Sequence, residues 1–109
     1  MRNKIGVIGA GLVGATAAFA LSQSGLASEI VLIDANAQRA RGEALDIEHG
    51  AALAPPVLVR NGEYPDLAEA HLVIIAAGAN QKSGETRLDL AQKNLAVIDS
   101  IVPQVARYA

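Results

Sequence analysis

The feature that most constrains the fold of this chain is a group of three glycines directly after a short apolar run. Ile5 to Gly14 reads IGVIGAGLVG, in which Gly9, Gly11 and Gly14 have the spacing G-x-G-x-x-G. The residues before the glycines are typical of a buried strand, and the alanine-rich run after them is typical of a helix. A strand that turns through such glycines into a helix aims the first N–H groups of the helix at an anion. The sequence therefore predicts a turn that binds the pyrophosphate of a dinucleotide.

Each glycine has a separate expected role in this turn. Gly9 lets the chain turn sharply off the strand, Gly11 leaves space between the backbone and the pyrophosphate, and Gly14 lets the helix pack closely on the strand. Alone, this spacing is a weak signal, so the remainder of the chain has to support the interpretation.

Composition narrows the class of protein. The 109 residues are 51% hydrophobic and 18% charged, as expected for one packed α/β domain rather than a disordered chain. A net charge of −2 without a basic run argues against nucleic acid and membranes as partners. The chain has no cysteine, which excludes disulfides and thiolate metal sites and makes a reducing cytoplasm the natural compartment. We expect no metal site. The apolar start is interrupted by glycines and is too short for a signal peptide or a membrane span.

The segment around the glycines forms one predicted strand–helix–strand unit. Residues 4–8 are the first strand, residues 13–24 are a helix that Gly25 ends, and residues 29–33 are the second strand. The unit spans about thirty residues, which is the size of a βαβ motif.

Asp34, at the carboxyl end of the second strand, supports cofactor binding. It lies twenty residues beyond Gly14, where a carboxylate can accept hydrogen bonds from both hydroxyls of the adenine ribose. A 2′-phosphate would meet the like charge of Asp34 there, so the sequence favours NAD over NADP. The alternative is that Asp34 only caps the helix that starts near Asn36. The spacing and the position at a strand end favour cofactor binding.

The rest of the chain continues the alternation of helices and strands. The predicted elements are a helix at 37–48, a strand at 57–60, a short helical crossover from Tyr64 and a strand at 72–77. On the first of these helices, Ala40, Ala44 and Ile47 share the face that we expect to contact the core. The pattern predicts an α/β fold, a Rossmann-type doubly wound parallel sheet truncated to about four strands with crossover helices.

Several other residues near the expected ligand edge have two interpretations. Arg39 would lie over the adenine or be solvated. Tyr64 would be a half-buried edge aromatic or lie near the cofactor. Gly78 and Ala79 follow a strand and would give a dinucleotide backbone room to approach, or simply form a tight turn.

The two histidines are weaker candidates. His49 is best interpreted as a helix-terminal residue that the helix dipole favours. His71 precedes the last predicted strand, and no residue near it in the sequence has a spacing that suggests a catalytic partner. Neither is expected to be catalytic.

A polar segment and a long helix follow the last strand. Residues 80–87 read NQKSGETR and suit a loop that closes over a substrate. The helix expected from about residue 86 to residue 108 contains Pro103, where we expect a kink. Its apolar stripe, which we expect to be buried, consists of Leu88, Ala91, Leu95, Ile98, Val102 and Val105.

Together these motifs resemble the NAD-dependent L-lactate dehydrogenases of the lactate/malate dehydrogenase family. The resemblance extends over all 109 residues, and the polar loop is its most specific part. Ser83 stands where many relatives have proline, which should loosen the loop slightly. The segments that carry the resemblance are GAGLVG, the strand-end Asp34, DIEHG, AAGANQKSGETRLDL and Lys93-Asn94.

The resemblance implies a set of residues that contact NAD. Those expected to line the pyrophosphate are Gly9, Gly11, Val13 and Gly14, with Asp34 on the ribose. The positions that match residues flanking NAD elsewhere are Arg39, Tyr64, Gly78, Ala79 and Ser100.

The resemblance also implies two residues that contact the substrate. Arg87 matches the loop arginine that moves onto the substrate carbonyl, where a guanidinium stabilises the negative charge that develops as hydride arrives. The plainer interpretation, an ordinary arginine at a helix start, is unattractive because a cation there opposes the helix dipole. Gln81 matches the position where malate enzymes carry an arginine for a second carboxylate. Since a neutral amide cannot offset an extra enclosed charge, pyruvate and lactate are the predicted substrates.

The resemblance places other parts of the active site outside these residues. The family's catalytic histidine, its aspartate partner and the arginine that binds the substrate carboxylate lie later in the chain. We therefore expect residues 1–109 to be an incomplete N-terminal dinucleotide-binding domain, without the C-terminal catalytic domain and inactive alone. The complete enzyme is expected to be a cytoplasmic homo-oligomer of glycolysis that acts on a small 2-keto or 2-hydroxy acid.

Two other classes of function stay open. A free-standing NAD-sensing module would suit the short chain, whereas the segment GETRLDL with its arginine favours a dehydrogenase. An excised folding module would carry the binding residues without using them. A rise in melting temperature on adding NAD would argue against the folding module.

Overall fold

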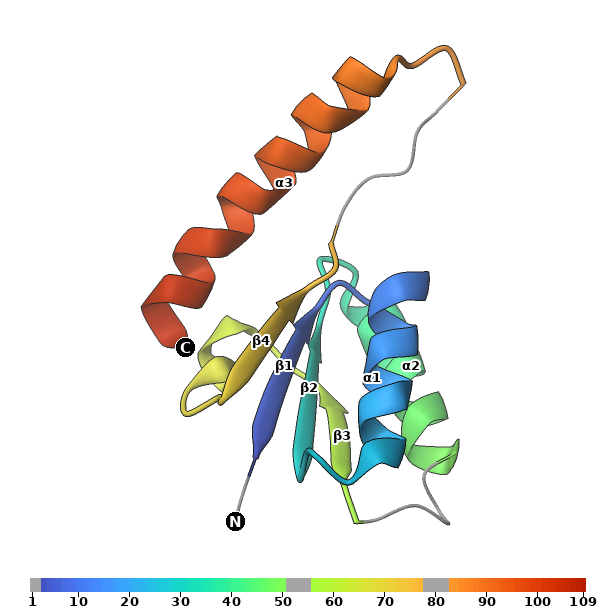
Figure 1. Ribbon diagram of the computed structural model, residues 1–109, viewed down its shortest axis with the longest axis vertical. Coiled ribbons are helices and arrows are strands. Elements are labelled where there is room, and N and C mark those ends of the chain that lie inside the picture. The colour runs from blue at the N-terminus through green and yellow to red at the C-terminus, as the bar shows by residue number, and fades with distance from the viewer. Residues whose placement is uncertain (1–2, 51–55, 78–82) are drawn as a thin grey trace.

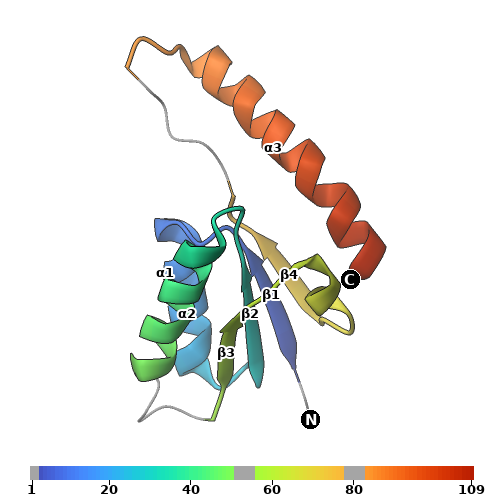
Figure 2. The same ribbon diagram turned by 180° about the vertical axis from the view of Figure 1, so that it is seen from behind.

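The protein is a four-stranded sheet with helices on both faces (Figures 1 and 2). The computed structural model describes residues 3–50, 56–77 and 83–109. Its strands are β1 (Lys4–Ile8), β2 (Glu29–Ile33), β3 (Leu58–Asn61) and β4 (Leu72–Ile75). Its helices are α1 (Leu12–Ser24), α2 (Ala37–Gly50), the short 3-10 helix η1 (Tyr64–Leu67) and α3 (Arg87–Tyr108).

The four strands are parallel and lie in the order β3-β2-β1-β4. β1 is the strand where the order reverses, because β2 lies on one side of it and β4 on the other. In open parallel sheets, ligands bind beside such a reversal, at the carboxyl ends of the strands. The predicted Rossmann-type sheet of about four strands is confirmed.

Each face of the sheet has its own apolar core, since successive side chains of a strand point to opposite faces. The face covered by α1 and α2 buries, among others, Val7, Ile30, Leu32, Ala40, Ala44 and Ile47. The opposite face, covered by η1 and the end of α3, buries Ile8, Val31, Ile33, Leu67 and Ile101. The predicted inward face of α2 is therefore confirmed.

Most predicted boundaries agree with the structure to within two residues. β1 and β2 begin and end as predicted, and Gly25, with a φ of 76°, ends α1 in the left-handed region. β3 begins one residue later than predicted, and β4 ends at Ile75. α3 continues through Pro103, and the kink expected there stays a prediction.

The apolar stripe predicted on α3 meets the core of the sheet only near its end, where Val105 packs against the cluster that contains Ile101. Leu88, Leu95 and Val102 are 68%, 61% and 47% exposed, whereas Ile101 is only 5% exposed. The first half of α3 extends past the carboxyl ends of the strands, so only its last turns lie over the sheet (Figures 1 and 2). The prediction of one buried stripe along the whole helix was therefore wrong.

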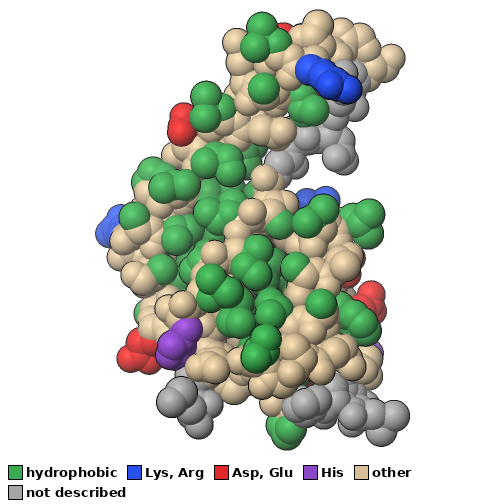
Figure 3. Space-filling view, in the orientation of Figure 1, with side chains coloured by type: hydrophobic (Ala, Val, Ile, Leu, Met, Phe, Trp, Pro, Cys, Tyr) green, Lys and Arg blue, Asp and Glu red, His purple; other side chains and the backbone are tan. Residues whose placement is uncertain are grey.

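The surface that α3 borders is largely apolar. Figure 3 shows apolar side chains gathered across the middle of this face, with the charged side chains at its margins. Among the helices that the structure describes, none combines the length and apolarity that crossing a membrane requires.

Candidate functional site

The turn after β1 is tied by backbone hydrogen bonds to the strands beside it. The N–H of Gly9 donates to the carbonyl of Ile33 at 2.7 Å, and the N–H of Ala76 donates to the carbonyl of Ile8 at 2.8 Å. Gly9 has a φ of 104°, which other residues rarely adopt. A Cβ on Gly9 would lie 2.7 Å from the backbone nitrogen of Ala77. The fold itself therefore requires glycine at this position.

The other two glycines of the turn differ in what the protein requires of them. A Cβ on Gly14 would overlap the carbonyl oxygen of Gly9, so glycine is needed to bring α1 against β1. A Cβ on Gly11 would meet no described atom within 4 Å beyond its chain neighbours. The backbone of Gly11, with φ −72° and ψ −170°, is open to any residue. Neither packing nor conformation requires glycine at position 11, and the space beside it is open to a ligand lying against the backbone.

The N-terminus of α1 lies open beside Gly11. Gly11 is the N-cap residue and has no side chain to bond the first N–H groups of the helix. Leu12 and Val13, in the first turn, are 86% and 71% exposed. Because first-turn N–H groups have no partner inside a helix, they can donate to a bound anion. The space beside Gly11 and these donors fit the pyrophosphate of a dinucleotide.

Asp34 joins the glycine turn to the end of β2. Its Oδ2 accepts a hydrogen bond from the N–H of Ala10 at 2.6 Å, and its Oδ1 accepts one from the N–H of Asn36 at 2.8 Å. The side chain is only 6% exposed. The sequence pattern did not point to Ala10. Its place between two glycines of the turn is the signal by which it could have been found.

Asn36, not Asp34, caps α2. The Oδ1 atom of Asn36 accepts a hydrogen bond from the N–H of Arg39 at 3.1 Å, which is the bond expected of an N-cap side chain. The carboxylate of Asp34 reaches across to the glycine turn instead. The hydrogen bonds therefore do not support the interpretation of Asp34 as a helix cap.

Arg39 covers the outer side of the Asp34 carboxylate. Its Nη2 lies 2.9 Å from Oδ2 and 3.1 Å from Oδ1 of Asp34. Burial raises the pKa of Asp34, but the N–H groups of Ala10 and Asn36 and the guanidinium of Arg39 outweigh burial and hold this pKa below its usual value. Asp34 is therefore ionised at neutral pH, so both of its oxygens are hydrogen-bond acceptors.

The remaining predicted cofactor residues lie on other elements. Tyr64, at the start of η1, is half-buried and packs against the core cluster on the α3 face. Ser100 is exposed on α3, and its Oγ donates to the carbonyl of Val97 at 2.7 Å. Three further predicted site residues lie outside the described residues, namely Gly78, Ala79 and Gln81.

Arg87 is the first residue of α3 and is exposed. Thr86 and Asp89 form a capping box, in which each side chain accepts a hydrogen bond from the backbone N–H of the other. This box defines where the helix starts and hence where Arg87 projects. Among the residues that the structure describes, no hydrogen-bond or ion-pair partner of its guanidinium is found. The start of α3 lies well away from the glycine turn in Figure 1, so the structure does not bring Arg87 into that site.

The histidines lie apart from the glycine turn. His49 is exposed in the last turn of α2. His71 precedes β4 at the amino ends of the strands, where its Nδ1 accepts a hydrogen bond from the N–H of Lys4 at 3.4 Å. Within residues 3–50, 56–77 and 83–109, no group of three metal-binding side chains occurs.

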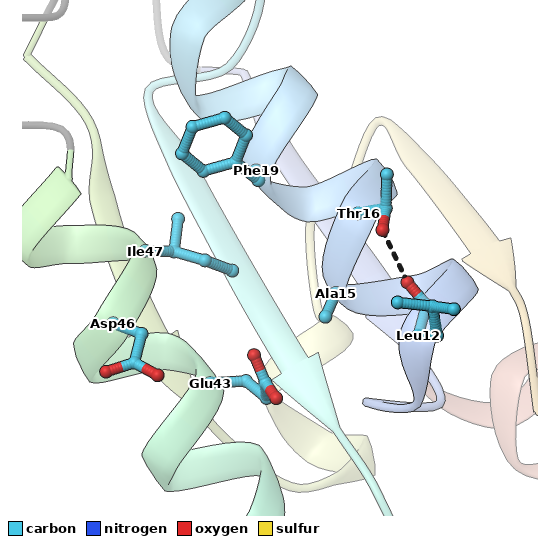
Figure 4. Close-up of a pocket in the computed structure, with 7 residues that line it drawn as sticks. All are labelled: Leu12, Ala15, Thr16, Phe19, Glu43, Asp46 and Ile47. Carbon is cyan, nitrogen blue, oxygen red and sulfur yellow. Dashed lines mark hydrogen bonds between the residues drawn. The ribbon is translucent and has the colours of Figure 1, made fainter.

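A separate open groove lies between α1 and α2 and measures about 430 Å³. Figure 4 shows the ring of Phe19 and the side chain of Ile47 pointing into the space between the two helices. Carboxylates of Glu43 and Asp46 also line this groove, and they would repel a pyrophosphate. The glycine turn, not this groove, is therefore the candidate nucleotide site.

The fold and the site define a class of protein. A parallel sheet, a glycine turn where the strand order reverses and a carboxylate at the end of the next strand together form a dinucleotide-binding domain. The family described as lactate/malate dehydrogenase, NAD binding domain, matches residues 3–109, and this chain belongs to that family. The resemblance noted in the sequence is confirmed.

Two curated relatives show how far the similarity extends. The chain is 55% identical to L-lactate dehydrogenase 1 of Clostridium acetobutylicum over 106 residues, which cover 97% of this chain and 34% of that protein. It is 55% identical to the L-lactate dehydrogenase of Bacillus caldotenax over 104 residues, which cover 94% of this chain and 33% of that protein. The chain thus spans about a third of the length of the curated relatives it matches.

Solved structures of a lactate and a malate dehydrogenase share the fold of this chain. The minor L-lactate dehydrogenase of Enterococcus mundtii, in its ligands-bound form, superposes with a TM-score of 0.93 at 42% identity, covering 98% of this chain and 34% of that chain. The malate dehydrogenase of Archaeoglobus fulgidus in complex with NADH superposes with a TM-score of 0.88 at 38% identity. The match covers 97% of this chain and 37% of that chain. The arrangement of sheet and helices described here is therefore the arrangement found in these enzymes.

Proposed function

We propose that this chain is the NAD-binding part of an L-lactate dehydrogenase, which interconverts pyruvate and NADH with L-lactate and NAD. The observation that carries the proposal is the 55% identity to two L-lactate dehydrogenases over 94% and 97% of the chain. The space beside Gly11 supports the cofactor half of the proposal, because no part of the described fold uses it.

In this proposal the cofactor lies along the carboxyl edge of the sheet. The glycine turn and the first N–H groups of α1 hold the pyrophosphate, and Asp34 accepts hydrogen bonds from the ribose. When bound, NAD exchanges a hydride with the substrate carbon. The other proposed contacts of the cofactor are Val13, Arg39, Tyr64, Gly78, Ala79 and Ser100.

Arg87 and Gln81 are proposed to act on the substrate. Arg87 would stabilise the negative charge that develops on the substrate carbonyl oxygen, and this effect is larger in the transition state than in the ground state. Its exposure at the start of α3 leaves the guanidinium free to move onto a ligand. Gln81 would favour a substrate with one carboxylate, since a neutral amide cannot pair with a second one.

The substrate assignment is testable in a chimera in which residues 1–109 replace the matching third of a complete L-lactate dehydrogenase. We expect the chimera to prefer pyruvate to oxaloacetate and Gln81→Arg to shift kcat/KM toward oxaloacetate. Arg87→Gln should lower kcat more than it raises KM, because the interaction forms mainly in the transition state. An unchanged preference in Gln81→Arg would contradict the assignment of Gln81.

The isolated chain distinguishes an enzyme part from a sensor. We expect the 109 residues to bind NADH without oxidising it in the presence of pyruvate, and to regain turnover when the remaining two-thirds of a relative is supplied as a separate chain. Binding without any such rescue would favour a free-standing NAD-sensing module. For the complete enzyme we propose a cytoplasmic homo-oligomer that acts in glycolysis.

A further inference from the structure

The start of α3 extends beyond the sheet, so its geometry depends on contacts within its own segment. Leu88, in the first turn, is 68% exposed, and the helix begins past the carboxyl ends of the strands (Figures 1 and 2). The capping box of Thr86 and Asp89 is one such contact, and it defines the first residue of the helix. The direction from which a chain enters a helix is defined instead by a contact of the residue before the cap.

An ion pair between Glu85 and Lys93 is a contact of that second kind. Glu85 directly precedes the cap residue, and its Oε2 pairs with Nζ of Lys93, which lies almost two turns into α3. The side chain of Glu85 is only 11% exposed, and that of Lys93 is 42% exposed. The chain therefore enters α3 along the side of the helix that carries Lys93. An open groove of about 450 Å³ on this side is lined by Glu85, Asp89, Gln92, Lys93 and Ala96.

Arg87 lies between the two members of this ion pair in the sequence. Its backbone is defined by Glu85 on one side and by the helix that carries Lys93 on the other, while its own side chain is exposed. A group that stabilises charge in a transition state acts best when its position is defined before the reaction, because realignment then costs nothing in each turnover. The ion pair is partly buried, so solvent and salt weaken it less than they weaken a fully exposed pair.

We propose that Lys93 is a positioning residue for Arg87, and that it acts through the carboxylate of Glu85 to define the direction from which Arg87 meets the substrate. The inference rests on the proposed function, because it concerns the substrate contact of Arg87. Lys93 itself touches neither substrate nor cofactor. Its effect is on the step in which negative charge develops on the substrate oxygen, so it changes kcat and not KM.

The test measures kcat and KM for pyruvate in the chimera in which residues 1–109 replace the matching third of a complete L-lactate dehydrogenase. Lys93→Met should lower kcat at least about threefold and change KM less than about twofold, since it removes the charge that holds Glu85. Glu85→Gln breaks the same pair from the other side and should give the same result. Lys93→Arg keeps a cation that pairs with a carboxylate, so its kcat should stay within about twofold of the original value.

A double-mutant cycle separates positioning from a general effect on folding. In an Arg87→Gln background, Lys93→Met should lower kcat less than about twofold further, because the group that Lys93 positions is already absent. Gln92→Met is the matched control, since Gln92 lines the same groove and is exposed but carries no charge. Its kcat should stay within about twofold of that of the unchanged chimera.

Unchanged kcat in both Lys93→Met and Glu85→Gln would overturn the inference. So would an equal fall in kcat for Lys93→Met in the presence and absence of Arg87, or a loss in Lys93→Arg as large as that in Lys93→Met. Thermal melting followed by circular dichroism checks folding, and Glu85→Gln carries the comparison if Lys93→Met does not fold. A folded chimera without lactate dehydrogenase activity would overturn the proposed function and this inference together, whereas an active chimera indifferent to both substitutions overturns the inference alone.

Discussion

Within one turn, Gly11 is expected to serve ligand binding, whereas Gly14 serves the packing of α1 on β1. Gly11→Ala should change the free energy of unfolding by less than about 1 kcal/mol, because the added Cβ meets open space in a permitted conformation. Alanine is a poorer N-cap than glycine, but it also reduces the freedom of the unfolded chain, and these two effects oppose each other. The same Cβ would occupy the space for the pyrophosphate, so NAD affinity should fall at least about tenfold. Chemical denaturation and calorimetric titration measure the two effects.

Gly14→Ala is the control for that prediction. Its Cβ would overlap the carbonyl oxygen of Gly9, so this variant should lose about 1–3 kcal/mol of stability through displacement of α1 from β1. If Gly11→Ala loses as much stability as Gly14→Ala, the explanation of Gly11 by a ligand is wrong.

Asp34 should make stability depend on pH in the acid range. Its pKa is lower in the folded protein than its usual value, so its stabilising effect is complete above about pH 4 and is lost as the pH falls through the folded-state pKa. The unchanged chain should therefore exceed Asp34→Asn in stability at pH 7, and the difference should shrink below about pH 4. Urea denaturation at a series of pH values measures it. A difference that stays constant down to pH 2.5 would count against this role of the carboxylate.

At the scale of single residues, the sequence predicted positions better than contacts. It placed Gly9, Gly14 and Asp34 at one edge of the sheet, because the glycine spacing and the apolar runs define where each strand ends. The bond from Ala10 to Asp34 and the cover by Arg39 depend on how two loops meet in space, and no spacing in the chain specifies that.

Among the elements, α3 has two halves in different surroundings. Ile101 is 5% exposed and packs against the sheet, so Ile101→Ala should cost about 2–5 kcal/mol. Leu95 lies in the projecting half and is 61% exposed, so Leu95→Ala should lower the free energy of unfolding by less than about 0.5 kcal/mol. Equal losses in the two variants, measured by urea denaturation of the 109-residue chain, would show that the projecting half is packed after all.

The strands were predicted more accurately than this helix for a physical reason. β1 and β2 are buried on both faces, so their ends coincide with the ends of continuous apolar runs. In α3, a period of 3.6 residues identifies side chains that share a face, but it does not tell how much of the helix lies over the sheet. Leu88 and Leu95 follow that period and are nonetheless exposed.

For the molecule as a whole, ligand binding and folding should be coupled. The proposed NAD site joins the glycine turn to Asp34, and hydrogen bonds join both to β1, β2 and the end of β4. A ligand at one hundred times its dissociation constant stabilises the folded state by about 2.7 kcal/mol. Adding NAD should therefore raise the melting temperature, as scanning calorimetry measures. No rise at saturating NAD would favour a folding module that carries unused binding residues.

The contrast between Gly11 and its two neighbours also describes how such a domain would change over generations. A descendant that no longer bound a dinucleotide would still need Gly9 for its backbone and Gly14 for the contact of α1 with β1. Nothing in the described fold would preserve Gly11. Substitutions would therefore accumulate first at Gly11, and a copy with the outer two glycines but not the central one would mark a lineage that kept the architecture after abandoning the nucleotide.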